Sequence, residues 1–327
     1  MIQDLGRVFA VPCRPRAAPL LAAGLLAFAT TQALALDVVF DYRFDRHGFF
    51  DPATAVGAER RSVLEAAASV FEPLSDALAP IDPGGTLGSW RVAFRHPSWS
   101  SFFEEAVVEN LSVAANSVVI FVGASPSNGS VLGIAEGGTI TVTGGGSDFE
   151  TLVTTRGQAG ALDPQPTDFG PWGGSFWFNS NTPWHLGLDT VGLDATKADM
   201  LTTATHEIGH LLGMGEAPSW GTWVEGTSGN YRFTGPAVTA LYGGDVPLDP
   251  IAAHFGEGVF STVDGLPQET LMDPTTARGQ REFMTALDYA ALSDIGWQVS
   301  PVPEPATNAL LAAGVLLLGA RLRRRRH

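Results

Sequence analysis

The chain has 327 residues, of which 45% are hydrophobic and 16% charged, so it can bury a sizeable core, and disorder is not expected to describe the whole chain. The two ends hold eight of the 19 basic residues and two of the 34 acids, which leaves residues 36–300 with 11 basic and 32 acidic residues and a net charge near −21. A surface this acidic disfavours binding to nucleic acid and anionic membranes and suits a soluble secreted protein; it is compatible with Ca²⁺ binding, although no calcium motif is present.

Residues 1–35 predict a secretory signal peptide. Three arginines precede the apolar run "APLLAAGLLAFATTQALA", which ends in a small-residue cleavage site, Ala-Leu-Ala. An N-terminal membrane anchor is the less favoured interpretation, because the run is short and contains polar residues such as Thr30 and Gln32. The only cysteine, Cys13, lies in this leader, so no disulfide is expected in the mature chain.

The first part of the mature chain predicts a helix followed by strands. Residues 62–79, "SVLEAAASVFEPLSDALA", place apolar side chains at helical spacing, with Pro73 as a possible kink. Short β-like runs separated by glycine-rich turns follow at residues 90–95, 117–123, 138–144 and 174–180. Because a further helix comes after these strands, we expect an α+β fold.

That further helix is predicted over residues 197–212. Thr196, with Asp199 three places on, predicts a capping box, and apolar residues then repeat at spacings of three and four. Gly213 is expected to end the helix.

The sequence "HEIGH" in this helix matches the H-E-x-x-H pattern of zinc hydrolases. His206 and His210 lie one helical turn apart and supply two nitrogen ligands at compatible positions. Glu207 is expected to act as the general base on a metal-activated water and then to protonate the leaving amine. The pattern predicts Zn²⁺ as the cofactor; two histidines on a helix surface without a metal are the less favoured interpretation.

Two residues are candidates for the third zinc ligand. Glu216 stands where the longer metzincin motif has a histidine, and a carboxylate is an acceptable zinc ligand. His254 is the only histidine after His210 apart from the terminal His327. The spacing alone does not choose between the two.

The remainder of the mature chain predicts an irregular region and one more helix. Residues 214–284 contain many glycines and prolines and show little periodicity, so we expect an irregular C-terminal subdomain. The last helix is predicted over residues 286–296, with Thr285 and Asp288 forming a capping box and Gly296 at its end.

Residues 301–327 form a tail with a Pro-Glu-Pro turn, an apolar run from Ala309 to Ala320, and an arginine cluster. This order, over residues 302–327, resembles the PEP-CTERM sorting signal of Gram-negative bacteria. The resemblance implies processing by an exosortase-type enzyme, transient anchoring in the inner membrane, and release to the cell envelope or the extracellular matrix. A plain tail anchor is less favoured, because the run is shorter than the ~20 residues that a spanning helix needs.

From His206 onward, the order of "HEIGHLLG", an insertion, "AHF", "ETLMDP" and "TALDYAALSDIGW" resembles the leishmanolysin-like metzincins. The similarity covers about residues 200–298. In that family the third zinc histidine follows an insertion and precedes an aromatic residue. The resemblance therefore implies zinc ligation by His206, His210 and His254, with Glu207 as the base and Met272 packed beneath the metal.

The same resemblance implies a metzincin-like catalytic domain over residues 36–300, with a mixed sheet and an active-site helix. We expect this domain to divide into an upper half, residues 36–213, and a lower half, residues 214–300.

Together these features predict a secreted zinc-dependent endopeptidase acting on a protein or peptide substrate. We expect the substrate to lie along a sheet edge formed by residues 138–144 or 174–180. The alternative is a non-catalytic matrix or adhesion protein on the same fold, which would not need a general base such as Glu207. A zinc hydrolase for another substrate also stays open, because H-E-x-x-H specifies water activation and leaves the substrate undefined.

Overall fold

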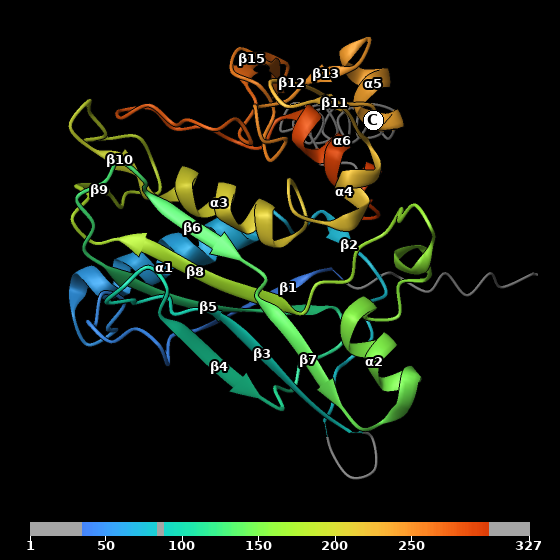
Figure 1. Cartoon of the computed structure of the whole chain (residues 1–327). Helices are drawn as coiled ribbons and strands as arrows, with labels where there is room; N and C mark the ends of the chain where they lie inside the picture. Colours follow the sequence, from blue (N-terminus) through green and yellow to red (C-terminus); the bar gives the residue numbers. More distant parts are fainter. Residues whose placement is uncertain (1–34, 84–87, 301–327) are drawn as a thin grey trace, which may run out of the picture. The chain divides into compact units, whose positions relative to one another are not determined.

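The structure, a computed structural model, describes residues 35–83 and 88–300 (Figure 1). Its main sheet has four strands in the order β1-β5-β8-β6. Strands β1 (Asp37–Asp41), β5 (Ser117–Ser125) and β8 (Gly173–Asn179) run parallel, and β6 (Gly133–Glu136) pairs antiparallel with β8 at the edge. This mixed sheet and the six α-helices found among the described residues confirm the predicted α+β class.

A second, antiparallel sheet has the order β4-β3-β7, formed by Glu105–Glu109, Ser89–Arg95 and Thr139–Thr143. Strands β3, β5, β7 and β8 confirm the four predicted β-like runs. Strands β1, β4 and β6 were not predicted, and neither were helix α2 (Gly146–Thr155) and the 3₁₀ turn that follows it (Ala159–Leu162).

Strand β5 is buried along its whole length because both of its faces are covered. Val118, Ile120 and Val122 pack into the core that contains helices α1 (Ala55–Ser69) and α3 (Met200–Leu211). Val119 and Phe121 point the other way, into the core formed with the second sheet. The main sheet therefore lies between a helical layer and the second sheet (Figure 1).

Helix α1 corrects the helix predicted over residues 62–79. It begins earlier because the Thr54 hydroxyl oxygen accepts a hydrogen bond from the Gly57 amide at 3.0 Å. It ends before Pro73, whose ring disfavours helical geometry in the preceding residue. The chain continues instead into β2 (Leu74–Ser75), which pairs with β16 (Gln298–Val299).

Helix α3, which carries the "HEIGH" sequence, packs against β6 and α1. The predicted capping box of Thr196 and Asp199 is wrong, because Asp199 is itself the N-cap and accepts from the Thr202 amide at 3.1 Å. Asp199 also forms a buried ion pair with Arg281 at 2.7 Å, which ties the start of α3 to the C-terminal part of the chain. The residues just before the helix form the short strand β10 (Ala198–Asp199), parallel to β9 (Trp184–His185).

The region 214–284 contains more regular structure than predicted. It holds two short helices, the small sheet β11-β12-β13 and the hairpin β14-β15. The last helix is confirmed, with both hydrogen bonds of the Thr285–Asp288 capping box present. The bounds are α4 (Pro218–Thr222), β11 (Val224–Thr227), β12 (Asn230–Phe233), α5 (Pro236–Tyr242), β13 (Val246–Pro247), β14 (Phe260–Val263), β15 (Leu266–Glu269) and α6 (Ala286–Asp294).

Candidate metal centre

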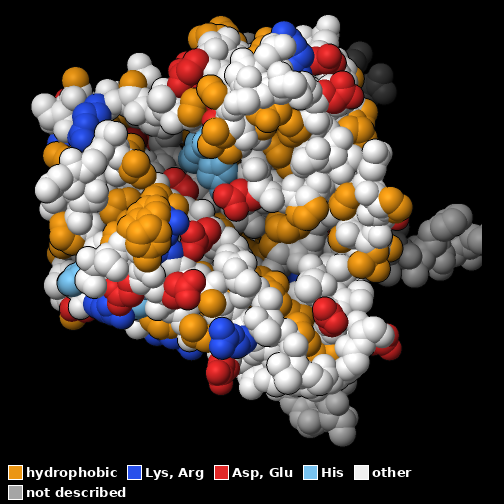
Figure 2. Space-filling view, in the orientation of Figure 1, with side chains coloured by type: hydrophobic (Ala, Val, Ile, Leu, Met, Phe, Trp, Pro, Cys, Tyr) orange, Lys and Arg blue, Asp and Glu red, His pale blue; other side chains and the backbone are white. Residues whose placement is uncertain are grey.

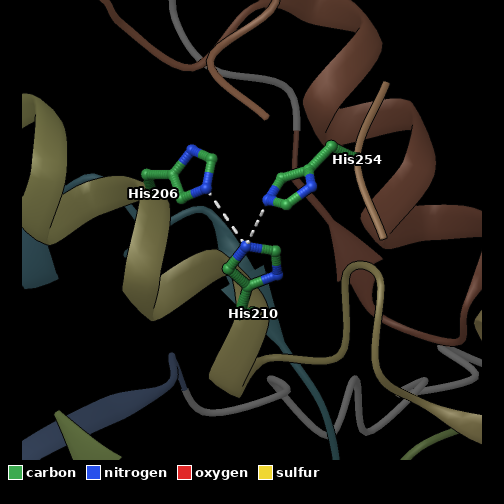
Figure 3. Close-up of side chains that lie close together, drawn as sticks. All are labelled: His206, His210 and His254. Carbon is green, nitrogen blue, oxygen red and sulfur yellow. Dashed lines mark hydrogen bonds between the residues drawn. The ribbon is translucent and has the colours of Figure 1, made fainter. Parts of the chain in front are cut away.

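Three histidine side chains converge at one point (Figure 3). The Nε2 atom of His210 lies 3.1 Å from Nε2 of His206 and 3.1 Å from Nε2 of His254. His206 and His210 come from successive turns of α3, and His254 comes from the segment between β13 and β14. The structure thus brings together two residues of the "HEIGH" motif and a histidine 44 positions beyond His210.

The second nitrogen of each ring faces an oxygen atom. The distance from Nδ1 is 2.8 Å to the Leu271 carbonyl for His206, 2.8 Å to the Met214 carbonyl for His210, and 3.1 Å to Asp249 Oδ2 for His254. Because carbonyl and carboxylate oxygens only accept, these contacts assign the ring proton to Nδ1. Each Nε2 atom then carries a lone pair, and the three lone pairs face one another.

This donor set fits a metal ion. The lone pairs on His206 and His254 each face that of His210 at 3.1 Å, and all three nitrogens lie within 4.8 Å of one another, so they repel unless a cation lies between them. Neutral imidazoles whose far nitrogen is held by an oxygen are the usual ligands of zinc and related borderline cations. Burial and the neighbouring imidazoles lower the pKa of His206 to about 4 and that of His210 well below its ordinary value, so both rings stay neutral at neutral pH.

Gly213 shapes the turn that holds His210. Its φ angle of +110° lies in the left-handed region, and a β-carbon there would lie 2.8 Å from the Phe169 ring and 2.9 Å from the β-carbon of Ala217. The turn brings the Met214 carbonyl back to His210 Nδ1. The glycine of H-E-x-x-H-x-x-G is therefore required both to end α3 and to orient the second histidine.

Further hydrogen bonds fix the position of the Leu271 carbonyl that contacts His206. The amides of Leu271 and Met272 donate to the Asp288 carboxylate at 3.1 and 3.2 Å. Met272 is 1% exposed, and its sulfur lies against the helix backbone at Gly209, where an added β-carbon would come within 2.8 Å of it. The residue predicted to pack beneath the metal thus packs under α3 between the two motif histidines.

His254 is held by a tight local turn. Asp249 Oδ1 accepts from the Ala253 amide at 2.8 Å, while Oδ2 faces the His254 ring. The next residue, Phe255, donates its amide to the Met272 carbonyl at 2.8 Å. The segment that carries His254 is therefore connected directly to the segment that orients His206.

Glu207 lies on the face of α3 that meets strand β6. The residue is 8% exposed, and a β-carbon on Gly133 would lie 3.2 Å from its carboxylate, so the side chain lies close against the strand. Burial raises the pKa of Glu207 to about 8; the Ala135 amide, which donates to the carboxylate, lowers the pKa, and Glu216 raises it. A buried carboxyl beside a nitrogen cluster is a suitable proton acceptor and donor.

The three histidines and Glu207 line a pocket of about 580 Å³. Figure 2 shows histidine side chains at the base of a hollow in the surface. Strand β6 lines this pocket through residues 133–135, and residues 274–276, which follow Met272 in the chain, line it as well. Glu216, the other candidate ligand, is not part of the histidine cluster; it is exposed and lines this pocket and an adjoining one of about 400 Å³.

The strand beside the pocket is β6, and neither predicted edge strand holds this position. Residues 174–180 form β8, which is covered by β5 on one side and β6 on the other and so has no free edge among the described strands. Residues 138–144 form β7, the edge of the second sheet. Strand β6 was not predicted, because a run of four residues that begins with glycine shows little alternation of apolar and polar side chains.

Two further residues of the site were missed as functional residues. Asp249 belongs to no sequence pattern other than an Asp-Pro pair, which is typical of turns. Asp288 was predicted only as part of a helix capping box. Asp249 contacts His254 within a local turn, and Asp288 acts on His206 through Leu271, 17 residues before it in the chain; helix and strand periodicity reports neither contact.

Residues 301–326 match the family described as the PEP-CTERM protein-sorting motif. The match confirms the predicted sorting signal and indicates an exported protein that is recognised by an exosortase and sorted to the cell surface of a Gram-negative bacterium. No curated protein matches the chain. The tail and the predicted signal peptide up to residue 34 lie outside the described residues, among which no helix is long and apolar enough to cross a membrane.

Proposed function

We propose that the protein is an exported zinc-dependent endopeptidase of metzincin type. The single observation that carries this proposal is the convergence of the three Nε2 atoms of His206, His210 and His254 beside the buried Glu207 carboxylate. Nitrogen ligands on three sides, with one side open to a pocket, suit catalytic rather than structural zinc.

In this proposal each residue has one role. The three imidazoles hold the ion, and their oxygen partners keep the Nδ1 protons in place and the Nε2 lone pairs free. When bound, zinc supplies Lewis-acid polarisation of the scissile carbonyl and acidification of a water molecule. The Glu207 carboxylate accepts a proton from that water and returns it to the nitrogen of the leaving amine.

Strand β6 is the proposed docking edge for substrate. It is one of the two edge strands of the main sheet, and it lines the pocket through Gly133, Ile134 and Ala135. A free strand edge pairs with an extended peptide through backbone hydrogen bonds, independently of the side chains. This arrangement favours peptides over other substrates of a zinc hydrolase, because only an extended main chain uses such an edge.

The test combines zinc content with casein cleavage for the wild type, Glu207→Gln, His254→Ala and Glu216→Ala. We expect Glu207→Gln to keep one zinc per chain and lose cleavage, and His254→Ala to lose both. Glu216→Ala is the matched control, since it removes a pocket carboxylate outside the histidine cluster; it should keep its zinc.

Two outcomes would contradict the proposal in different ways. Full zinc in His254→Ala together with loss in Glu216→Ala would overturn the ligand assignment. Zinc bound by the wild type without hydrolysis of any peptide would favour the alternative function, a non-catalytic matrix or adhesion protein at the cell surface.

A further inference from the structure

A group of three acidic side chains lies close to the histidine site. One carboxylate oxygen from each of Glu257, Glu269 and Asp273 lies within 4.8 Å of the other two. Glu257 is three residues after His254, and Asp273 directly follows Met272. The cluster therefore joins the two segments that the histidine site also joins.

Asp273 differs from an ordinary surface acid. It is 1% exposed, and its Oδ1 atom has no hydrogen-bond partner in the part of the chain that the structure describes. A buried carboxylate oxygen loses its hydration, and that loss needs compensation by a donor or a cation. The carboxylate of Asp273 has two further carboxylates as neighbours, and these offer no proton when ionised.

No basic side chain compensates the charge of this cluster. Among residues 35–83 and 88–300, no lysine or arginine forms an ion pair with Glu257, Glu269 or Asp273. Burial, followed by the charges of Glu282, Glu269 and Glu257, raises the pKa of Asp273 to about 8. Without a bound cation, the surroundings of Asp273 therefore disfavour its ionised form.

We propose that Glu257, Glu269 and Asp273 form a Ca²⁺ site. The donors are all carboxylate oxygens, which calcium prefers, and three carboxylates supply up to six of the 6–8 oxygen ligands that calcium takes. Glu257 is exposed, so water can complete the coordination. An all-oxygen set with no nitrogen or sulfur does not suit zinc, so this site and the histidine site select different ions.

The backbone around the cluster indicates what the ion stabilises. The Gly258 amide donates to the Glu269 carboxylate, and the Thr275 hydroxyl donates to Glu257 at 2.7 Å. These bonds position two of the three carboxylates, those of Glu269 and Glu257. Calcium would add a link between the loop after His254 and the turn after Met272, and this role does not depend on whether the histidine site is catalytic.

The experiment is calcium titration of the secreted chain by isothermal calorimetry, after passage over chelating resin and with one equivalent of zinc restored. Thermal unfolding is then compared without calcium and with about 5 mM CaCl₂, above the ~1 mM upper end of dissociation constants for extracellular calcium modules. We expect one calcium per chain and a rise in Tm of roughly 2–4 °C.

The variant Glu257→Gln/Glu269→Gln changes an exposed and a half-buried side chain and leaves Asp273 in place, so it is expected to fold. It should bind calcium at least tenfold more weakly and show no calcium-dependent rise in Tm. Glu225→Gln, an exposed glutamate on β11, is the matched control and should behave as the wild type. Absence of calcium binding by the wild type, or equal binding by the double variant, would overturn the proposal.

Discussion

The Nδ1 atom of His206 lies 2.8 Å from the carbonyl oxygen of Leu271, which is 65 residues further along the chain. That carbonyl is in turn fixed by Asp288, because the carboxylate accepts the amides of both Leu271 and Met272. The orientation of a motif histidine on α3 therefore depends on the first turn of α6.

Replacing Asp288 by alanine is expected to weaken both stability and zinc binding. The change removes the acceptor of four hydrogen bonds, including the amide and the hydroxyl of Thr285 at 2.7 Å each. Because these donors are buried, we expect the free energy of unfolding to fall by about 3 kcal/mol or more. Urea denaturation and a zinc titration measure the two effects.

Ser293→Ala is the control, since Ser293 is exposed on the same helix. Unchanged zinc affinity in a folded Asp288→Ala variant would show that α6 does not orient the site.

Asp249 is expected to set the zinc affinity through His254. Asp249→Asn keeps the size of the side chain and removes the negative charge that holds the ring proton on Nδ1. Loss of such a partner weakens metal binding by about 10–100-fold, and we expect the lower half of that range because the amide oxygen still accepts. Competition with a chromophoric chelator measures the affinity, with exposed Asp245→Asn as the control. Equal affinities in both variants would contradict this role.

The local features of the site were predictable from the sequence, and its long-range features were not. The motif helix, its terminal Gly213 and the last capping box each depend on residues within one or two helical turns of one another. The four predicted strands are short runs rich in β-branched and aromatic residues. Helix α1 was misplaced because the apolar periodicity continues past Pro73, whereas the helix itself already ends at Ser69.

Which residue lies beside His206 and His210, Glu216 or His254, could be determined only from the structure. By linear position Glu216 is closer to the motif, yet the chain turns at Gly213 and carries Glu216 to the pocket wall. His254 reaches the other two rings after 43 intervening residues, through the Asp249 turn and the Phe255–Met272 hydrogen bond. Spacing within an irregular segment does not determine distance in the fold.

Gly213→Ala is expected to destabilise the protein by about 1–3 kcal/mol. Alanine is strained at a φ of +110°, and its β-carbon would overlap Phe169 and Ala217. The contrasting control is Gly221→Ala in α4, where a β-carbon meets nothing within 4 Å and the helical backbone favours alanine, so stability should stay the same or rise. Chemical denaturation of the two variants gives the comparison; equal effects would refute the conformational argument.

Stability is expected to fall as the pH rises through the titration of Asp76. This residue is 6% exposed, and burial, with a contribution from Asp168, raises its pKa from 3.8 to about 6. Because the folded state holds the proton more tightly than the unfolded state, the stabilisation is complete below about pH 4 and is lost as the pH rises through about 6.

Asp76→Asn carries no charge to titrate, so its stability at pH 7.5 should exceed that of the wild type by about 2–3 kcal/mol, and the difference should vanish near pH 4. Urea denaturation between these pH values, with the exposed Asp82→Asn as control, measures the difference. A difference that does not change with pH would contradict the assignment.

The central claim is that the three histidines hold a zinc ion beside which Glu207 acts as the general base of peptide hydrolysis. It is tested most directly by the hydrolysis of a fluorogenic peptide library by the zinc-loaded wild type, with Glu207→Gln at equal zinc content as the reference. We predict cleavage by the wild type and a value of kcat/KM lower by about 10²–10⁴-fold in the variant. No cleavage by the fully zinc-loaded wild type, or equal cleavage by the variant, would contradict the claim.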